Sequence, residues 1–399
     1  MATSRQPWSV PGVILFSHGD LSYEADLSRP LVEELAQSRL GEMTVPAWER
    51  TEKKRLREVI VRSLPPTSSD DPETLERMRA RLREEAHLAT YLQHPRIART
   101  LGPYEVQGVI YIVSDRVEGT SLNTLITYSQ MREKFLSPAF CLYVGAEVAG
   151  ALHYAHTCKG ENGAPLGIVH RDLNPARIFL EPEGGVILTD FARARSLLPG
   201  RVASTLPRPQ GEVFYCSPEA LLCEETDPRS DLFSLGLMLL ELATCRHLYN
   251  TANVLPDDLE EALTEKVKGK VLDAAITAML ADLPDHADDC ILRAATFTRQ
   301  DVDEITEPLA HPLRSIVRRL IQREPEDRYQ SAADVEADLR AGLAALGAPF
   351  GAREALDEVL ISLTGASMNQ RVIGPTNEGQ LPPDMVTEED IITERGGTT

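Results

Sequence analysis

Short apolar runs bounded by turn residues characterise the first 120 residues of the chain. One run covers residues 13–16, and apolar and polar residues alternate over 31–47 in a way that fits two strands and a turn. Further strand-like runs cover 58–62 and 104–117. Between these two, Pro72 opens a stretch whose apolar residues recur at helical spacing. This part of the chain is therefore predicted to be rich in β-strands, with one helix.

Longer helical patterns dominate the remaining two thirds of the chain. Ser137-Pro138 is typical of a helix start, and the apolar pattern behind it continues to His156. Another apolar run covers residues 232–242, and the segment 313–346 fits two helices. Residues 352–363 predict one further amphipathic helix. The second part of the chain is therefore predicted to be mainly helical.

Two short motifs lie within residues 168–191. The first reads His170-Arg171-Asp172 and is followed by a short apolar strand, and a turn at Gly184-Gly185 leads to a second strand that ends in Asp190-Phe191. In order and spacing, this stretch resembles the catalytic loop and the metal-binding motif of the eukaryotic-type Ser/Thr protein kinases. Two motifs joined by a hairpin make the resemblance far more specific than a lone His-Arg-Asp.

Further motifs of that family follow the same order along the chain. The run 58–62 resembles the strand that carries its lysine, and Glu85 matches the helical glutamate that pairs with this lysine. Pro218-Glu219, Asp231 and Arg328 match positions that build the helical lobe. The resemblance covers about residues 31–346. It implies an α+β fold of two lobes, a small β-rich N-lobe and a larger helical C-lobe.

This fold predicts a division of the chain into consecutive segments. They are an N-terminal extension (1–30) that adds a strand or strap to the small lobe, the N-lobe (31–118), the C-lobe (119–346) with an acidic helical insert at about 250–308, an extra helix (347–364) and an acidic, disordered tail (365–399).

Several positions that contact phosphate, metal or acceptor in the family carry other residues here. Asn174 stands where the family has a lysine, Arg177 where an asparagine holds a metal ion, and Arg62 in place of the strand lysine. Of the Gly-rich phosphate loop only Gly41 is retained, in our alignment of residues 36–41. The resemblance implies these candidate site residues: Asp172 and Asn174 as catalytic residues, and Gly41, Arg62, Glu85, Asp115, Val117, Arg177 and Asp190 as cofactor-binding residues, Asp115 and Val117 being in the hinge that would meet an adenine.

Arg177 is the most consequential of these departures. Its guanidinium would occupy the place of a magnesium ion, and two cations repel each other at low dielectric. One hypothesis is that Arg177 turns inward and pairs with Asp190. The alternative is that its long side chain turns outward to solvent. No metal site is predicted: the resemblance implies ATP as the ligand, but of the family's metal ligands only Asp190 is retained, and Arg177 replaces the asparagine.

The function predicted from these departures is that of a pseudokinase, a regulatory or interaction module with weak or absent phosphotransfer. Its partners would be proteins, with an active kinase as one candidate. One alternative is an atypical but active Ser/Thr kinase that uses Asp172 as base. A second is a nucleotide-binding switch without catalysis. Ser196, Ser204 and Thr205 are available in the predicted activation segment for phosphorylation.

Composition narrows the range of partners. The net charge of −20 argues against nucleic acid or an anionic membrane. The six scattered cysteines, without a Cys-x-x-Cys pair, indicate neither a disulfide framework nor a zinc site. The apolar run at 232–242 is interrupted by Ser234 and Glu241 and is too short for a membrane span. We therefore expect a cytoplasmic protein without membrane insertion.

Overall fold

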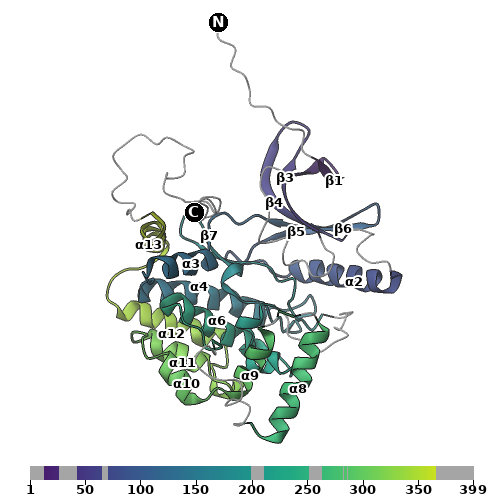
Figure 1. Ribbon diagram of the computed structural model, residues 1–399. Helices are drawn as coiled ribbons and strands as arrows, with labels where there is room; N and C mark the ends of the chain where they lie inside the picture. The colour runs from purple at the N-terminus through teal and green to yellow at the C-terminus, as the bar shows by residue number, and fades with distance from the viewer. Residues whose placement is uncertain are drawn as a thin grey trace, which may run out of the picture.

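The computed structural model has a small β-rich lobe above a larger helical lobe (Figure 1). The structure describes residues 13–26, 43–64, 71–198, 211–250, 263–281, 283–284 and 286–364. The predicted α+β, two-lobed architecture is thereby confirmed.

A six-stranded antiparallel sheet forms the N-lobe, in the order β1-β2-β3-β4-β6-β5. The strands are β1 (Ile14–His18), β2 (Leu21–Ala25), β3 (Met43–Arg50), β4 (Arg55–Ser63), β5 (Thr100–Val106) and β6 (Val109–Asp115).

The first two strands lie within the segment predicted as an N-terminal extension. Strand β1 pairs with β2, and β2 pairs with β3, so residues 14–25 belong to the N-lobe sheet, in line with the strand predicted to pack on the small lobe. The partner of β3 on this side is therefore Leu21–Ala25. The strand predicted to start near residue 31, together with Gly41, lies outside the described residues. The chain reverses between β1 and β2 at Gly19, whose positive φ of 58° suits glycine.

The sheet curls until its two outermost strands approach each other. The ring of Phe16 on β1 lies 4.2 Å from Tyr111 on β6 and 5.6 Å from Tyr104 on β5, measured between centroids. Phe16 also stacks on Tyr23 at 4.5 Å. These rings and the valines of β4 form a core inside the curl. An aromatic residue on β1 thus stabilises the curvature by linking opposite edges of the sheet.

The other face of the sheet packs against α2 (Pro72–Ala89). The carboxylate of Asp71 accepts hydrogen bonds from the N–H groups of Glu73 and Thr74, which caps the start of the helix. Leu82 and Ala86 are buried in a second small core with Ile110 and Ile112 of β6. This packing holds the helix against β5 and β6, and from there Glu85 pairs with Arg62 of β4.

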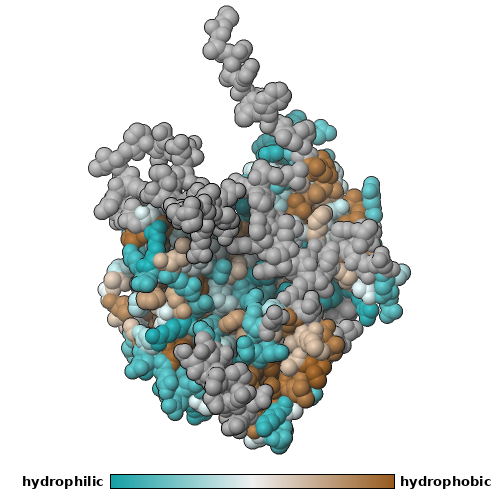
Figure 2. Space-filling view, in the orientation of Figure 1, coloured by the Kyte–Doolittle hydropathy of each residue, from teal (hydrophilic) through white to brown (hydrophobic). Residues whose placement is uncertain are grey.

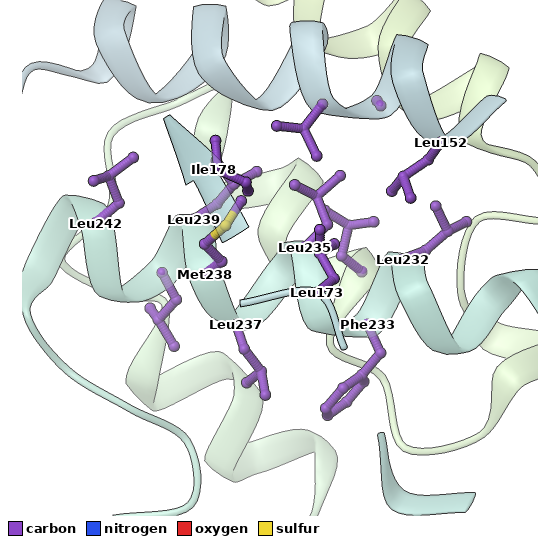
Figure 3. Close-up of a cluster of buried hydrophobic side chains, with 14 of the residues drawn as sticks. Leu152, Leu173, Ile178, Leu232, Phe233, Leu235, Leu237, Met238, Leu239 and Leu242 are labelled. Atoms are coloured by element: carbon purple, nitrogen blue, oxygen red, sulfur yellow. The ribbon is translucent and has the colours of Figure 1, made fainter. Parts of the chain in front are cut away.

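Helices α4 (Pro138–Thr157) and α6 (Pro228–Thr244) form the centre of the C-lobe. Their facing side chains include Leu152, Leu232, Leu235 and Leu239, which are all buried (Figure 3). The other elements of this lobe are β7 (Thr120–Ser121), α3 (Leu122–Arg132), η1 (Pro175–Arg177), β8 (Ile178–Leu180), β9 (Val186–Leu188), η2 (Val213–Tyr215), α5 (Pro218–Leu221), α8 (Glu265–Leu280), α9 (Ala287–Thr296), α10 (Arg299–Ile305), α11 (Leu313–Leu320), η3 (Pro325–Asp327) and α12 (Ala332–Ala345). Among the described residues, no helix combines the length and apolar character needed to cross a membrane.

In its described part, the segment predicted as a helical insert contains the three helices α8, α9 and α10, joined by turns. Helix α9 contributes Cys290 and Ile291 to the main core, and Val302 of α10 joins the same core. Both helices are thus integral to the packing of the lobe. The idea that the segment is an insertion relative to the family stays a prediction.

A final helix, α13 (Ala352–Thr364), confirms the predicted extra helix and docks on α3 and α4. The carboxylate of Glu358 accepts hydrogen bonds from the N–H and the hydroxyl of Ser137, at 2.5 and 2.6 Å, just before α4 begins. Ala355 and Val359 are buried beneath it. Gly184 allows this contact, because a Cβ there would lie 1.8 Å from the carbonyl oxygen of Ala352. The helix therefore completes the N-terminal cap of α4.

We expect Glu358→Ala to lower the free energy of unfolding by about 1–3 kcal/mol, since it removes two charge-assisted hydrogen bonds at a helix start. Urea unfolding of the full chain measures this. Glu307→Ala, which truncates an exposed glutamate elsewhere in the C-lobe, serves as the control and should change stability by less than about 0.5 kcal/mol. Equal stability of the two variants would show that Glu358 does not support α4.

Candidate functional site

Asp231, at the start of α6, holds the loop that carries the first motif. Its carboxylate accepts hydrogen bonds from the N–H groups of His170 and Arg171, at 2.8 and 2.9 Å, and lies 2.9 Å from Nε2 of His156. Burial raises the pKa of Asp231, but His156, His170 and the backbone donors outweigh this effect and lower it. The ring of His170 meets Phe191 edge-on at 4.5 Å. Both motifs are therefore fixed to each other and to the central helix.

Asp172 is 4% exposed, and both of its carboxylate oxygens have partners. Oδ1 accepts hydrogen bonds from Nδ2 of Asn174 at 3.0 Å and from the N–H of Glu212 at 2.9 Å. Oδ2 accepts from Nε and Nη2 of Arg177 at 3.1 and 2.9 Å, and Nε of Arg193 lies 3.5 Å away. The lone pairs that a general base would offer to an acceptor hydroxyl are thus engaged within the chain.

Arg177 bridges the two aspartates of the motifs. Its Nη1 lies 3.1 Å from Oδ2 of Asp190, while Nη2 binds Asp172. Its side chain is 14% exposed. The backbone is held as well, because Thr189 donates to the carbonyl oxygen of Arg177 from its N–H at 2.8 Å and from its hydroxyl at 3.0 Å. The inward orientation is therefore correct, and the outward alternative is wrong.

Asp190 stays ionised in this environment. Burial raises its pKa, but the positive charges of Arg177 and Arg62 outweigh burial and hold the pKa well below the usual range of an aspartate. The residue has a φ of +60°, in the left-handed region that is uncommon for residues other than glycine. Its Oδ1 accepts the N–H of Ala192 at 3.2 Å. The second motif is thus anchored by guanidinium groups.

Arg62 and Glu85 form the predicted ion pair between β4 and α2. Their side chains are 18% and 16% exposed, so the pair is largely shielded from water. Arg62 also contributes to the low pKa of Asp190, which places it in the same electrostatic cluster. An arginine at this position keeps the charge of a lysine, but its planar, branched head binds differently.

The arrangement does not fit a magnesium ion. Mg²⁺ prefers an octahedron of oxygen ligands, whereas here a guanidinium lies between the carboxylates of Asp172 and Asp190. Within the described ranges, no group of three or more His, Cys, Asp or Glu side chains could hold a metal ion. The residues present therefore do not fit the divalent ion that proteins of this fold usually bind.

The hinge residues stand apart from this cluster. The carboxylate of Asp115 binds Arg57 at 3.2 Å and Arg99 at 3.1 Å, and Val117 is half-buried in the connection that follows β6. The structure thus brings together Arg62, Glu85, Asp172, Asn174, Arg177 and Asp190 of the predicted site, whereas the Asp115 carboxylate is bound elsewhere and Gly41 lies outside the described residues.

The segment around Gly211 and Glu212 contributes contacts that sequence reasoning missed. A Cβ on Gly211, which has a φ of +91°, would lie 2.6 Å from both the Arg171 carbonyl oxygen and Oδ1 of Asp172. Glycine is therefore required for this approach. A glycine seven residues before Pro218 was the available signal, but it did not indicate that the Glu212 N–H would bind Asp172. No comparable signal marked Arg193.

The expectation that Ser196 is available for phosphorylation is wrong for this conformation. Ser196 is only 1% exposed, so its hydroxyl is not accessible to another kinase. The other two residues considered, Ser204 and Thr205, lie outside the described residues.

Comparison with known proteins agrees with this geometry. The protein kinase domain family matches residues 50–338. Similar curated proteins include the tyrosine-protein kinase MasK of Myxococcus xanthus (28% identity; 65% of this chain and 38% of the relative) and two serine/threonine-protein kinases. These are PknA of Mycobacterium tuberculosis (30%; 55% and 52%) and PrkC of Bacillus subtilis (31%; 53% and 29%).

The chain spans between about a third and a half of the length of these relatives. The match to the family, over residues 50–338, nevertheless covers most of the residues that the structure describes. It includes the His170-Arg171-Asp172 and Asp190-Phe191 motifs and the central helices α4 and α6. Membership of this family implies ATP as a ligand, usually together with Mg²⁺. The chain belongs to the protein kinase domain family and resembles the Ser/Thr kinases of bacteria.

Proposed function

We propose that this chain is a pseudokinase: a regulatory module of the protein kinase fold with weak or absent phosphotransfer. The observation that carries the proposal is the guanidinium of Arg177, which binds Asp172 and Asp190 at the same time. One carboxylate is the family's base and the other its metal ligand, so a single side chain engages both working groups.

Phosphoryl transfer depends on positioning and on neutralising charge at the phosphate oxygens. Loss of one preorganised electrostatic group typically lowers a rate by about 10²–10³. Here the metal-binding Asn, the strand Lys and the Lys after the base are all replaced, by Arg177, Arg62 and Asn174. The rate losses from groups that act together are not additive. Even so, we expect the combined replacements to lower the rate of phosphoryl transfer by a factor of about 10³ or more.

An active, atypical Ser/Thr kinase is the second candidate. It is favoured by the ion pair of Arg62 with Glu85 within the N-lobe, which corresponds to the Lys–Glu pair that active kinases require, and by the packing of Phe191 on His170 within the C-lobe. In that case Asp172 would have to exchange Arg177 for the hydroxyl of a protein acceptor. A third candidate is a switch in which nucleotide binding alone, without transfer, alters the lobes.

Thermal unfolding with ATP, with and without Mg²⁺, followed by transfer of labelled phosphate, separates these functions. For the pseudokinase we expect transfer at background level and no gain in stability from adding Mg²⁺ to ATP. Stabilisation by ATP without transfer would favour the switch. Transfer at the ordinary rate of about 1–100 per second, abolished by Asp172→Asn, would establish the enzyme.

Arg177→Asn provides a gain-of-function test, since it restores the family's metal ligand beside Asp190. We expect ATP with Mg²⁺ to raise the Tm of this variant by at least about 2 °C more than that of the unaltered chain, because a ligand that binds only the folded state stabilises it. Arg193→Asn, which changes the neighbouring guanidinium, is the matched control. An equal response of all three proteins to Mg²⁺ would contradict the role given to Arg177.

The partner that we propose is another protein, with an active kinase as the first candidate, and the cytoplasm is the proposed location. The net charge of −20 disfavours nucleic acid and anionic lipid. Affinity purification of the full chain, followed by identification of the bound proteins, tests this proposal. Recovery of nucleic acid or lipid vesicles in place of a protein would contradict it.

A further inference from the structure

Helix α13 is firmly docked on the C-lobe, although it is a late addition to the chain. Its inner face is buried, with Ala355 and Val359 at 0% and 3% exposure. By contrast, the exposed apolar residues of α8 gather at the lower right of Figure 2. Polar contacts hold α13 as well, because Glu358 binds Ser137 before α4 and Nη1 of Arg132 on α3 donates to a carbonyl oxygen near the end of α13 at 3.0 Å.

The start of α13 lies on the turn of the β8–β9 hairpin. A Cβ on Gly184 would lie 1.8 Å from the carbonyl oxygen of Ala352, so the two backbones are in direct contact. The hydroxyl of Tyr143 on α4 donates to the carbonyl oxygen of Gly184 at 3.0 Å, and its ring lies 6.0 Å from that of Phe350, just before α13. The hairpin turn is thus held by both α4 and α13.

The other end of this hairpin carries the arginine bridge. Strands β8 and β9 pair over Ile178–Leu180 and Val186–Leu188. The next residue, Thr189, donates two hydrogen bonds to the carbonyl oxygen of Arg177, which precedes β8. Three residue pairs at about 3.3 Å per residue give a hydrogen-bonded ladder about 10 Å long. It joins the turn beneath α13 to the ion pair of Arg177 with Asp190.

We propose that α13 is a regulatory clamp on this hairpin. While α13 is docked, it keeps the two strands in register and holds the guanidinium of Arg177 on Asp172 and Asp190. Its release loosens the hairpin and weakens this bridge. Coupling carried by a shared element is reciprocal, so breaking the bridge also loosens α13. The inference rests on the role given to Arg177 in the proposed function, but its tests measure backbone exchange rather than phosphate transfer, so each idea can fail without the other.

Hydrogen exchange of the full chain tests the clamp. Val359→Asp places a charge in the buried face of α13 and changes no residue of the hairpin or the bridge. We expect the amides of residues 186–192 to exchange at least about fivefold faster, relative to those of α6, since local opening sets these rates. Val302→Ala, which truncates a buried side chain of α10, is the control for lost stability and should leave this ratio unchanged.

Glu358→Ala weakens the same docking more mildly, and it replaces Val359→Asp if that variant does not fold. Faster exchange in α13 with unchanged exchange in residues 186–192 would overturn the proposal, because α13 would then be docked without holding the hairpin.

The reverse direction gives an independent test. Arg177→Met alters the bridge and leaves α13 untouched, so we expect the amides of α13 to exchange faster by a comparable factor, again relative to those of α6. Arg318→Met, which removes an exposed arginine of α11, is the control and should not change α13. Unchanged exchange of α13 in Arg177→Met would show that helix and bridge are independent, which would overturn the clamp and leave the assays of phosphate transfer unaffected.

Discussion

Replacement of Arg328 by methionine is expected to lower the free energy of unfolding by about 3–5 kcal/mol. The guanidinium is fully buried and binds Glu219 through two nitrogens, at 2.9 and 2.8 Å. It also donates to the carbonyl oxygens of Gln322 at 2.8 Å and Arg323 at 2.6 Å. Its removal leaves Glu219 and these carbonyl groups buried without their donor, and the desolvation of each group is then uncompensated.

Several measurements check the importance of this pair. Urea unfolding gives the loss for Arg328→Met, and Arg318→Met, which removes an exposed arginine, should cost less than about 1 kcal/mol. Burial raises the pKa of Glu219, but Arg328 outweighs burial and lowers it. A double variant with Glu219→Gln should therefore lose less stability than the sum of the single variants. Strict additivity would mean that the two side chains act independently.

Replacement of Arg177 by methionine should give the second large effect, a loss of about 3–5 kcal/mol at neutral pH. Two carboxylates that share this guanidinium would then lie close together, and among the described residues Arg62 and Arg193 are positive charges that remain near them. Methionine is similar in length to the aliphatic part of arginine and keeps much of the packing. The loss in the free energy of unfolding therefore measures mainly the effect of removing the charge.

The pH dependence of that loss has a definite sign. In the unaltered chain the pKa of Asp190 is depressed, so this group stabilises the fold above the unfolded-state value of about 4, and that contribution is lost as pH falls through the folded-state value. Without Arg177, the largest contribution that lowers the pKa of Asp190 is lost while the neighbouring Asp172 carboxylate remains, so this pKa rises from its depressed value. The stability difference between the two proteins should then shrink as pH falls from 7 towards about 4. A difference that is constant across this range would show that Arg177 contributes through packing alone.

Much of the site could be predicted because its residues belong to short, contiguous motifs. The hairpin between Asp172 and Asp190 has local turn signals, and the pairing of Arg62 with Glu85 follows from a strand packed against one helix. The pairing of the first N-lobe strands could not be predicted in this way. Alternation near residue 31 resembled a strand. On the side away from Arg55–Ser63, however, Met43–Arg50 pairs with Leu21–Ala25, and a long connection separates these two strands in the sequence. Strand pairing depends on the packing of the whole sheet, including the aromatic residues inside its curl.

The sequence by itself determined the class of fold and the identity of the altered positions, because both are recorded in local patterns of residue type. Only the tertiary structure decided where the head group of Arg177 lies. A side chain of that length can turn towards solvent or inward. Its position depends on groups that three separate segments of the chain supply. These are Asp172 in its own loop, Asp190 beyond the hairpin, and the Glu212 segment, whose N–H occupies the other oxygen of Asp172 and leaves the facing one to Arg177.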